Sequence, residues 1–219
     1  MKCLMLLLSA LAGMMLSSAL PVNDDTFDPL ANATIVDLKW TVPISPGRTD
    51  TVFGTIEDVA RHLSVVDPKR FAANQDSIYD GVTASPPDHP AVSDSTKDDQ
   101  DGLYDVGRAV CRLYDDAKGN TIMTGIEHLR ALVGPASLPA NACGRVSCSW
   151  DSAIWWCNMS DRFLTLDSFG RIADGAQDLM NSCAFIQDEK HIGPFSGNQA
   201  FGYEHVNKWC TVVRKNHPC

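Results

Sequence analysis

The sequence predicts an α+β fold, in which a disulfide-stapled split β-α-β-β-α-β sandwich follows a mostly irregular, acidic N-terminal leader. Three observations support this. Strand-like and helix-like patterns alternate in that order after residue 102, and every cysteine except Cys3 lies in the same region. Residues 20–102 carry 15 Asp and Glu against 6 Lys and Arg, whereas residues 103–219 carry 12 against 11. We therefore expect a signal peptide at 1–19, a cysteine-free leader at 20–102 and an α+β domain at 103–219.

The first nineteen residues have the three zones of a secretory signal peptide. Lys2 supplies the positive charge, and the stretch from Cys3 to Leu16 is apolar apart from two small residues. Small side chains at the end of the segment predict cleavage after Ala19. The apolar run is shorter than the roughly 20 residues that a membrane span needs, and no later stretch qualifies. The sequence thus predicts secretion without a membrane span.

The leader contains one helix pattern between irregular segments. Residues 20–50 lack sustained periodicity and carry an N-glycosylation sequon at Asn32. Thr55 opens an amphipathic helix that Pro68 ends. Lys69 and Arg70 follow directly after Pro68. This dibasic pair is either a site of proteolytic processing or two solvated charges at the end of the helix. Residues 84–102 hold three prolines and five aspartates, which predicts a disordered linker because so little apolar surface cannot offset the entropy of ordering.

The C-terminal domain carries the patterns of the predicted sandwich. Residues 106–114 and 208–214 suit strands, and residues 187–198 suit a polar loop. Two helices are expected, at 120–133 and from Asp167 or Ser168 to Cys183, because apolar residues recur at helical spacing. The second of these stripes is the longer; it consists of Phe169, Ile172, Ala173, Ala176, Leu179 and Met180.

Residues 145–157 predict a β-hairpin around a turn at residues 150–153. If Trp150 faces Ala153, two sets of alternating side chains result. The expected core face holds Val146, Cys148, Trp150, Ala153, Trp155 and Cys157, and the outer face holds Arg145, Ser147, Ser149, Ile154, Trp156 and Asn158. A different turn offset would change every pairing partner.

The cysteines predict a disulfide framework typical of an oxidising export route. Because seven of the eight cysteines remain once Cys3 leaves with the predicted signal peptide, one thiol stays free or bonds a partner chain in a disulfide-linked dimer. Leaving one of seven unpaired allows 105 connectivities, from 7 choices times 15 pairings. The seven are Cys111, Cys143, Cys148, Cys157, Cys183, Cys210 and Cys219.

The sequence indicates no catalytic, cofactor or metal site. A secreted ribonuclease would need two acid-base groups, and the local candidates are Glu127 with His128 and Glu204 with His205, near His191. Adjacent helical residues point in different directions, however, which favours solvated histidines. No nucleophile elbow, zinc motif or phosphate-binding glycine loop occurs. The net charge of −9 argues against a nucleic-acid partner.

Trp156, beside Arg145 on the expected outer face, is the candidate anchor for a host protein or surface glycan. The alternative is burial of Trp156 beneath residues 20–70. A second sequon, at Asn158, lies just beyond the hairpin.

Two segments carry a family resemblance: Cys143-Gly-Arg-Val-Ser-Cys-Ser-Trp-Asp-Ser-Ala-Ile-Trp-Trp-Cys-Asn158 and Phe169-Gly-Arg-Ile-Ala-Asp-Gly-Ala-Gln177. The chain resembles a family of small secreted cysteine-containing proteins of filamentous ascomycete fungi. The resemblance implies a fungal source, secretion and a candidate effector role, and it carries no catalytic residues. The element order with disulfides also resembles, at the level of architecture only, the killer toxins of smut-fungus viruses.

The resulting functional expectation is a secreted effector that binds a host target and modulates plant immunity or cell death, outside host cells or after entry into them. Two alternatives remain: a killer-toxin-like antimicrobial protein, and a secreted ribonuclease or other hydrolase.

Overall fold

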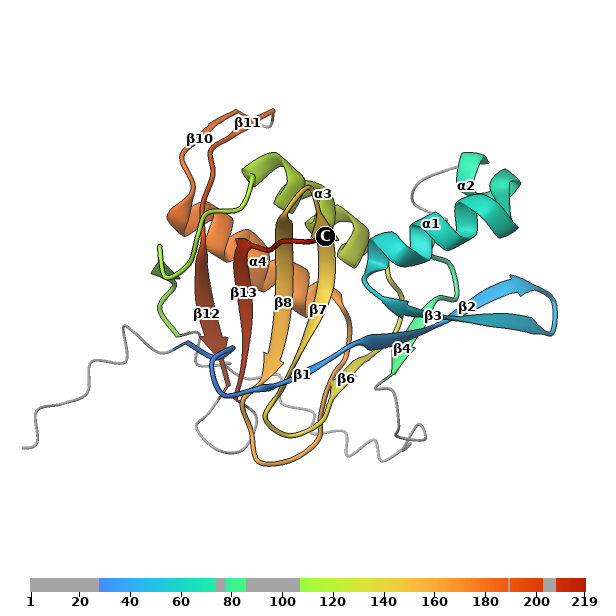
Figure 1. Ribbon diagram of the computed structural model, residues 1–219, viewed down its shortest axis with the longest axis horizontal. Coiled ribbons are helices and arrows are strands. Elements are labelled where there is room, and N and C mark those ends of the chain that lie inside the picture. The colour runs from blue at the N-terminus through green and yellow to red at the C-terminus, as the bar shows by residue number, and fades with distance from the viewer. Residues whose placement is uncertain (1–27, 74–77, 86–106, 189, 203–207) are drawn as a thin grey trace, which may run out of the picture.

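The computed structural model describes residues 28–73, 78–85, 107–188, 190–202 and 208–219 (Figure 1). These residues form a mixed α/β structure with four helices. The predicted signal peptide and its cut after Ala19 lie outside the described residues, as do most of the predicted linker and the pair Glu204 and His205.

A six-stranded sheet in the order β1-β7-β8-β13-β12-β5 forms the centre of the molecule. Its strands are antiparallel except for β1, which runs parallel to β7. The strands are β1 Thr34–Val36, β7 Ala142–Ser149, β8 Ser152–Asn158, β13 Trp209–Lys215, β12 Gly197–Phe201 and β5 Val110–Cys111.

Helices α3 (Gly119–Arg130) and α4 (Gly170–Cys183) pack side by side on one face of this sheet (Figure 1). Both were predicted from their apolar stripes. The α4 stripe is buried as expected, from Ile172 to Met180. Helix α3 ends at Arg130, three residues before the predicted end, and Val133 is 70% exposed. We call the covered side of the sheet the helix face and the other side the open face.

The β7–β8 hairpin exists as predicted, but its register differs. Ser149 pairs with Ser152, so that only Trp150 and Asp151 form the turn. A bulge between Arg145 and Ser147 then adds one unpaired residue, Val146, to β7. A bulge reverses the facing of every side chain before it, and Arg145 therefore lies opposite Trp155 instead of sharing a face with Trp156.

Cys148, Ala153, Trp155 and Cys157 share one face, as the alternation predicts, but this face does not belong to the main core. Ile154 and Trp156 lie in the main core on the helix face, where the sequence predicted an outer face. The open face holds a smaller buried cluster of Cys143, Cys148, Ala153, Trp155, Cys157, Cys210 and Val212.

The described part of the predicted leader is not irregular. Strands β2 (Leu38–Ser45) and β3 (Arg48–Gly54) form a hairpin, and β4 (Thr83–Ser85) pairs with the other edge of β2. Residues 84 and 85 therefore belong to a strand and not to the linker. Helix α1 (Ile56–Val66) covers this small sheet and leads into α2 (Pro68–Ala73). As expected, α1 begins after Thr55, whose N–H donates to the Asp58 carboxylate at 2.8 Å.

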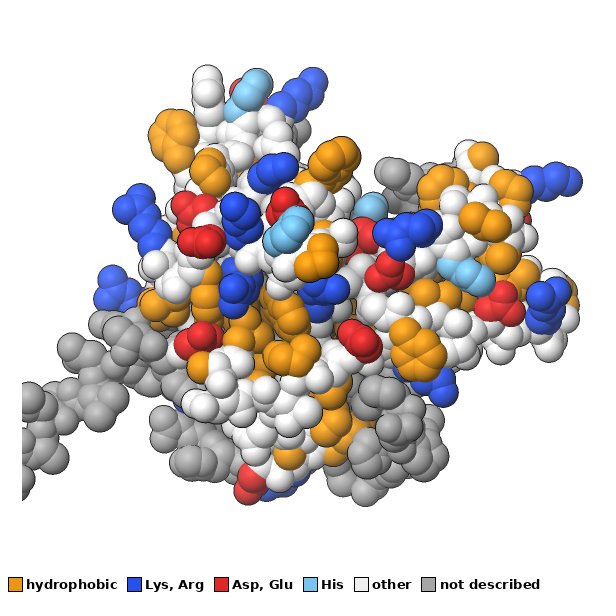
Figure 2. All heavy atoms as spheres, in the orientation of Figure 1, with side chains coloured by type: hydrophobic (Ala, Val, Ile, Leu, Met, Phe, Trp, Pro, Cys, Tyr) orange, Lys and Arg blue, Asp and Glu red, His pale blue; other side chains and the backbone are white. Residues whose placement is uncertain are grey.

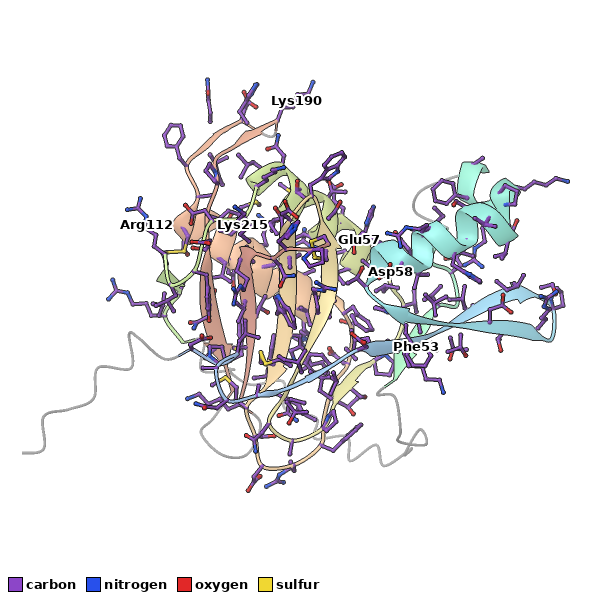
Figure 3. The ribbon with its side chains drawn as sticks, viewed as in Figure 1. Phe53, Glu57, Asp58, Arg112, Lys190 and Lys215 are labelled. Carbon is purple, nitrogen blue, oxygen red and sulfur yellow. A yellow bond between two sulfur atoms is a disulfide. The ribbon has the colours of Figure 1, made fainter. Side chains whose placement is uncertain are left out.

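This N-terminal unit shares one hydrophobic core with the C-terminal region. Trp40 is fully buried, and its ring centroid lies 5.2 Å from that of Phe169 at the start of α4. The Glu57 carboxylate accepts hydrogen bonds from the Ser147 hydroxyl and, at 2.8 Å, from the Cys148 N–H, beside the β7 bulge. Figure 3 shows Glu57 at the end of α1 nearest to β7. The described part of residues 28–85 is therefore built into the fold.

Several short strands complete the structure. β6 (Ala136–Leu138) pairs with β9 (Leu164–Leu166). β10 (Ile186–Asp188) and β11 (His191–Ile192) form a hairpin that projects from one end of the molecule (Figure 1). The segment predicted as a polar loop thus contains this hairpin and the start of β12. Because β5 pairs with β12 at the far edge, the strand order is not that of the predicted split sandwich.

Three disulfides join six of the seven cysteines: Cys111 to Cys183, Cys143 to Cys157, and Cys148 to Cys219. The first ties β5 to the end of α4, the second crosses the β7–β8 hairpin, and the third fixes the C-terminal tail to β7. Cys210 is left as the free thiol. The prediction of a disulfide framework with one spare cysteine is confirmed.

Candidate binding site

The turn between β7 and β8 exposes a tryptophan in an unusual backbone conformation. Trp150 and Asp151 have φ angles of 48° and 59°, and the Trp150 side chain is 75% exposed. Two-residue hairpin turns favour positive φ at both positions and usually place Asn and Gly there. An L-residue in the left-handed region costs about 1–2 kcal/mol. Residues in such sparsely populated backbone conformations cluster at functional sites, which makes the exposed Trp150 a candidate binding residue.

The C-terminal tail holds this turn in place. The ring Nδ1 of His217 lies 2.8 Å from a carboxylate oxygen of Asp151, and the Asn216 N–H donates to the Asp151 carbonyl at 2.9 Å. Cys219 is bonded to Cys148, two residues before the turn. In Figure 1 the C-terminus lies beside the upper ends of β7 and β8. The turn is therefore fixed by one covalent bond and two polar contacts.

Cationic groups surround the turn. The Lys118 ammonium lies 5.8 Å from the centroid of the Trp150 ring, and the Lys118 N–H donates to the Ser152 hydroxyl at 3.0 Å. Lys215, labelled in Figure 3, ends β13 beside the tail. The hydrogen bond from His217 lowers the pKa of Asp151, and the charges of His217, Lys118 and Lys215 lower it further. We call Lys118, Trp150, Asp151, Lys215 and His217 the turn surface.

The open face continues from this turn towards the middle of the sheet. The Arg145 guanidinium lies 5.8 Å from the centroid of the Trp155 ring, and that of Arg214 lies 5.1 Å from the Tyr114 ring. Arg145 also donates to the Pro218 carbonyl at 3.1 Å, which connects it to the tail. Figure 2 shows apolar side chains between cationic ones over β7, β8 and β13.

Trp156, the predicted partner anchor, is completely buried and belongs to the main core. The hypothesis of an exposed anchor at this position is therefore corrected in favour of burial. The core around it includes Leu38 from the N-terminal unit and Ile122 from α3. A side chain at Gly144, which pairs with Trp156, would come close to Leu38 and Leu138. The other predicted anchor residue, Arg145, does lie on the surface, half-buried on the open face.

The exposed tryptophan of the hairpin is thus Trp150, which sequence reasoning placed on the core face. The sequence carries no standard signal for this turn, because two-residue hairpin turns are usually marked by Asn-Gly, Asp-Gly or Gly-Gly, and Trp is uncommon at a position that needs a positive φ.

The described histidines form no acid-base pair suited to ribonuclease chemistry. His128 is half-buried on α3 with its ring centroid 5.5 Å from that of Tyr79, while Glu127 is exposed. His191 contacts Asp188 at 2.8 Å on the β10–β11 hairpin. These groups belong to separate elements, and no site emerges from them.

The two sequons have different environments. Asn32 is exposed in a bend before β1. Asn158 ends β8 and is only 2% exposed; its side-chain N–H groups point to the carbonyls of Leu138, Pro139 and Arg162, at 2.8–3.1 Å. Attachment of a sugar to the Asn158 nitrogen would require this network to open.

Lys69 and Arg70 lie on α2, and the Arg70 guanidinium donates to the carbonyls of Pro43 and Asp80. Proteases favour exposed loop tips, which this short helix is not. The same guanidinium lines a shallow hollow at the tip of the β2–β3 hairpin with residues 43–49. Processing at this pair stays a prediction.

Cys210 lies in the middle of the open face, directly across from Cys157. It is 1% exposed, and burial raises the pKa of its thiol. A disulfide to a partner chain through Cys210 would require the sheet to open, so the free cysteine does not favour the predicted dimer.

Within the described ranges, His, Cys, Asp and Glu side chains form no group of three or more that could hold a metal ion. In the same part of the chain, no helix is both long and apolar enough to cross a membrane.

Comparison with known proteins found no matching family profile, no similar curated protein and no similar solved structure.

Proposed function

We propose that this protein is a secreted fungal effector that binds a host target through the turn surface and thereby modulates plant immunity or cell death. The observation that carries the proposal is Trp150, which is 75% exposed on a turn with both residues at positive φ. Exposed tryptophans are enriched among the residues that dominate binding energies. The three disulfides agree with an oxidising, extracellular setting.

The way the turn is held supports binding more than stability. Exposure of an indole ring contributes no core packing, and the positive φ angles cost free energy. The Cys148–Cys219 disulfide and the Asp151–His217 contact nevertheless fix this conformation. A preorganised anchor loses little conformational entropy on binding, which raises affinity.

The test is infiltration of the purified secreted protein into leaf tissue, with and without a flagellin-type elicitor. We expect Trp150→Ala to remove the change in defence response or cell death. Phe185→Ala is the matched control, because Phe185 is a 78% exposed aromatic residue outside the turn surface. Circular dichroism and a non-reducing mass spectrum establish that both variants are folded and bridged.

Equal activity of Trp150→Ala and the wild type would contradict the proposal. Growth inhibition of competing microbes without any plant response would favour the killer-toxin alternative. RNA cleavage that is lost in His128→Ala or His205→Ala would favour the ribonuclease alternative.

A further inference from the structure

Three cysteines lie in one row across three neighbouring strands. Strand β8 runs between β7 and β13 in the central sheet (Figure 1), and Cys157 on β8 pairs with Cys143 on β7 and with Cys210 on β13. All three side chains belong to the buried cluster on the open face and are at most 1% exposed. Since Cys157 is bonded to Cys143, the free thiol of Cys210 lies directly beside an existing disulfide.

The spacing of the strands brings Cys157 within bonding reach of Cys210 as well. The Met159 N–H donates to the Lys208 carbonyl at 2.9 Å, and backbone direction alternates along a strand, so the N–H and C=O of Cys157 also point towards β13. Residues in such a hydrogen-bonded pair have Cα atoms about 5.5 Å apart, within the range of about 4.4–6.8 Å that disulfides join. Their Cβ atoms, about 5.5 Å apart, need to approach by about 1 Å. The existing bridge to Cys143 is therefore the less demanding of the two.

We propose that Cys157 is a shared disulfide partner, which bridges to Cys143 in the ground state and to Cys210 in a second isomer formed by thiol–disulfide exchange. In this step the Cys210 thiolate attacks the Cys157 sulfur, a bond forms between these two sulfurs, and the bond from Cys157 to Cys143 breaks. Cys143 leaves as a thiolate and takes up the proton that Cys210 lost. One disulfide and one thiol are present before and after the step, so no external oxidant or reductant takes part.

The surroundings of Cys143 suit a thiol as well as a bridge. Its sulfur lies 3.7 Å from the Pro29 carbonyl oxygen, which can accept a weak hydrogen bond from a thiol at this position. The exchange is slow in the folded protein, because burial raises the pKa of Cys210 and the thiolate is the attacking form. The second isomer ties β8 to β13 and opens the bridge within the β7–β8 hairpin. This inference goes beyond the proposed function and does not depend on it.

The first experiment counts free thiols in two matched variants that lose the same bridge. Cys143→Ser leaves Cys157 and Cys210 on adjacent strands. Cys157→Ser leaves Cys143 and Cys210 two strands apart, which is about 9–10 Å and too far for a disulfide. Each full secreted protein is unfolded in urea with iodoacetamide and without reductant, and its intact mass is measured. We expect one alkylated cysteine in the wild type, none in Cys143→Ser and two in Cys157→Ser.

Either variant can contradict the proposal. Two alkylated cysteines in Cys143→Ser would overturn it, because Cys157 and Cys210 would then not be within bonding reach. No alkylated cysteine in Cys157→Ser would also overturn it, since Cys143 and Cys210 would then pair without the shared partner.

The exchange itself is tested in the folded wild type, which does not depend on the folding of either variant. The protein is incubated at mildly alkaline pH without reductant, quenched in acid, digested with pepsin and mapped by mass spectrometry. We expect a peptide pair that links Cys157 to Cys210 to increase with time. Cys210→Ser, which lacks the attacking thiol, should keep Cys157 bonded to Cys143 throughout. Absence of the new peptide pair from the incubated wild type would refute the exchange.

Discussion

Replacement of Trp156 by alanine is the most direct test of which face of the hairpin lies in the main core. If Trp156 lies in the main core, its loss removes a fully buried side chain. A tryptophan buries about 150–250 Å², which corresponds to about 4–6 kcal/mol at about 25 cal/mol per Å². Measured Trp-to-Ala substitutions in cores cost about 3–5 kcal/mol. We therefore expect a loss of about 3–5 kcal/mol in the free energy of unfolding.

The assay is urea unfolding followed by far-ultraviolet circular dichroism, with the disulfides kept intact. For a chain of this size, the expected loss corresponds to a decrease of about 6–20 °C in Tm. Trp150→Ala is the matched control from the same hairpin. Because Trp150 is 75% exposed and alanine at this φ is equally unfavourable, its effect should stay within about 0.5 kcal/mol.

The reverse result would refute the assignment of the core face. A loss below about 1 kcal/mol for Trp156→Ala, together with a large loss for Trp150→Ala, would mean that the faces are those the alternation of the sequence first indicates. Trp156 would then again be the candidate anchor.

Because burial raises the pKa of the Cys210 thiol, iodoacetamide should leave the native protein unlabelled and add one equivalent after unfolding in urea without reductant; labelling of the native protein would contradict this. Intact mass of the secreted protein, with Asn32→Gln as the control, should show no glycan at the buried Asn158; a glycan that persists in Asn32→Gln would show the opposite. Cys148→Ala and Cys219→Ala should each cost about 2–5 kcal/mol in urea unfolding, since they open the same 71-residue disulfide; unequal losses would show that the bridge is not the cause.

Local patterns were sufficient to predict three of the four described helices, whereas the short helix α2, which begins at the expected stop Pro68, was not predicted. The stripes of α1, α3 and α4 recur at 3.6-residue spacing, and their apolar members are buried as the spacing requires. The strands of the N-terminal unit were missed, although Leu38, Trp40 and Val42 alternate with polar residues and are all buried. That run is short and contains Pro43, which weakened the strand signal.

The candidate site could not be predicted because it depends on one residue of register. With turn residues 150–153, Trp150 belongs to the core face; with Trp150 and Asp151 alone, it points into solvent. The bulge at Val146 then moves Arg145 from the face of Trp156 to that of Trp155. No local propensity predicts the bulge. Beside it, the Ser147 hydroxyl and the Cys148 N–H donate hydrogen bonds to Glu57 on α1, which is far away in the sequence.

The sequence by itself determined three amphipathic helices, the hairpin and the fact that the seven cysteines beyond the predicted signal peptide cannot all pair with one another. Each of these depends on residues close in sequence or on a simple count. Only the tertiary structure decided that the single cysteine is Cys210, that residues 34–66 join the core and that Trp150 is the exposed tryptophan. These features depend on pairings between residues far apart in the chain, and the free energy of such pairings is set by the whole packed core.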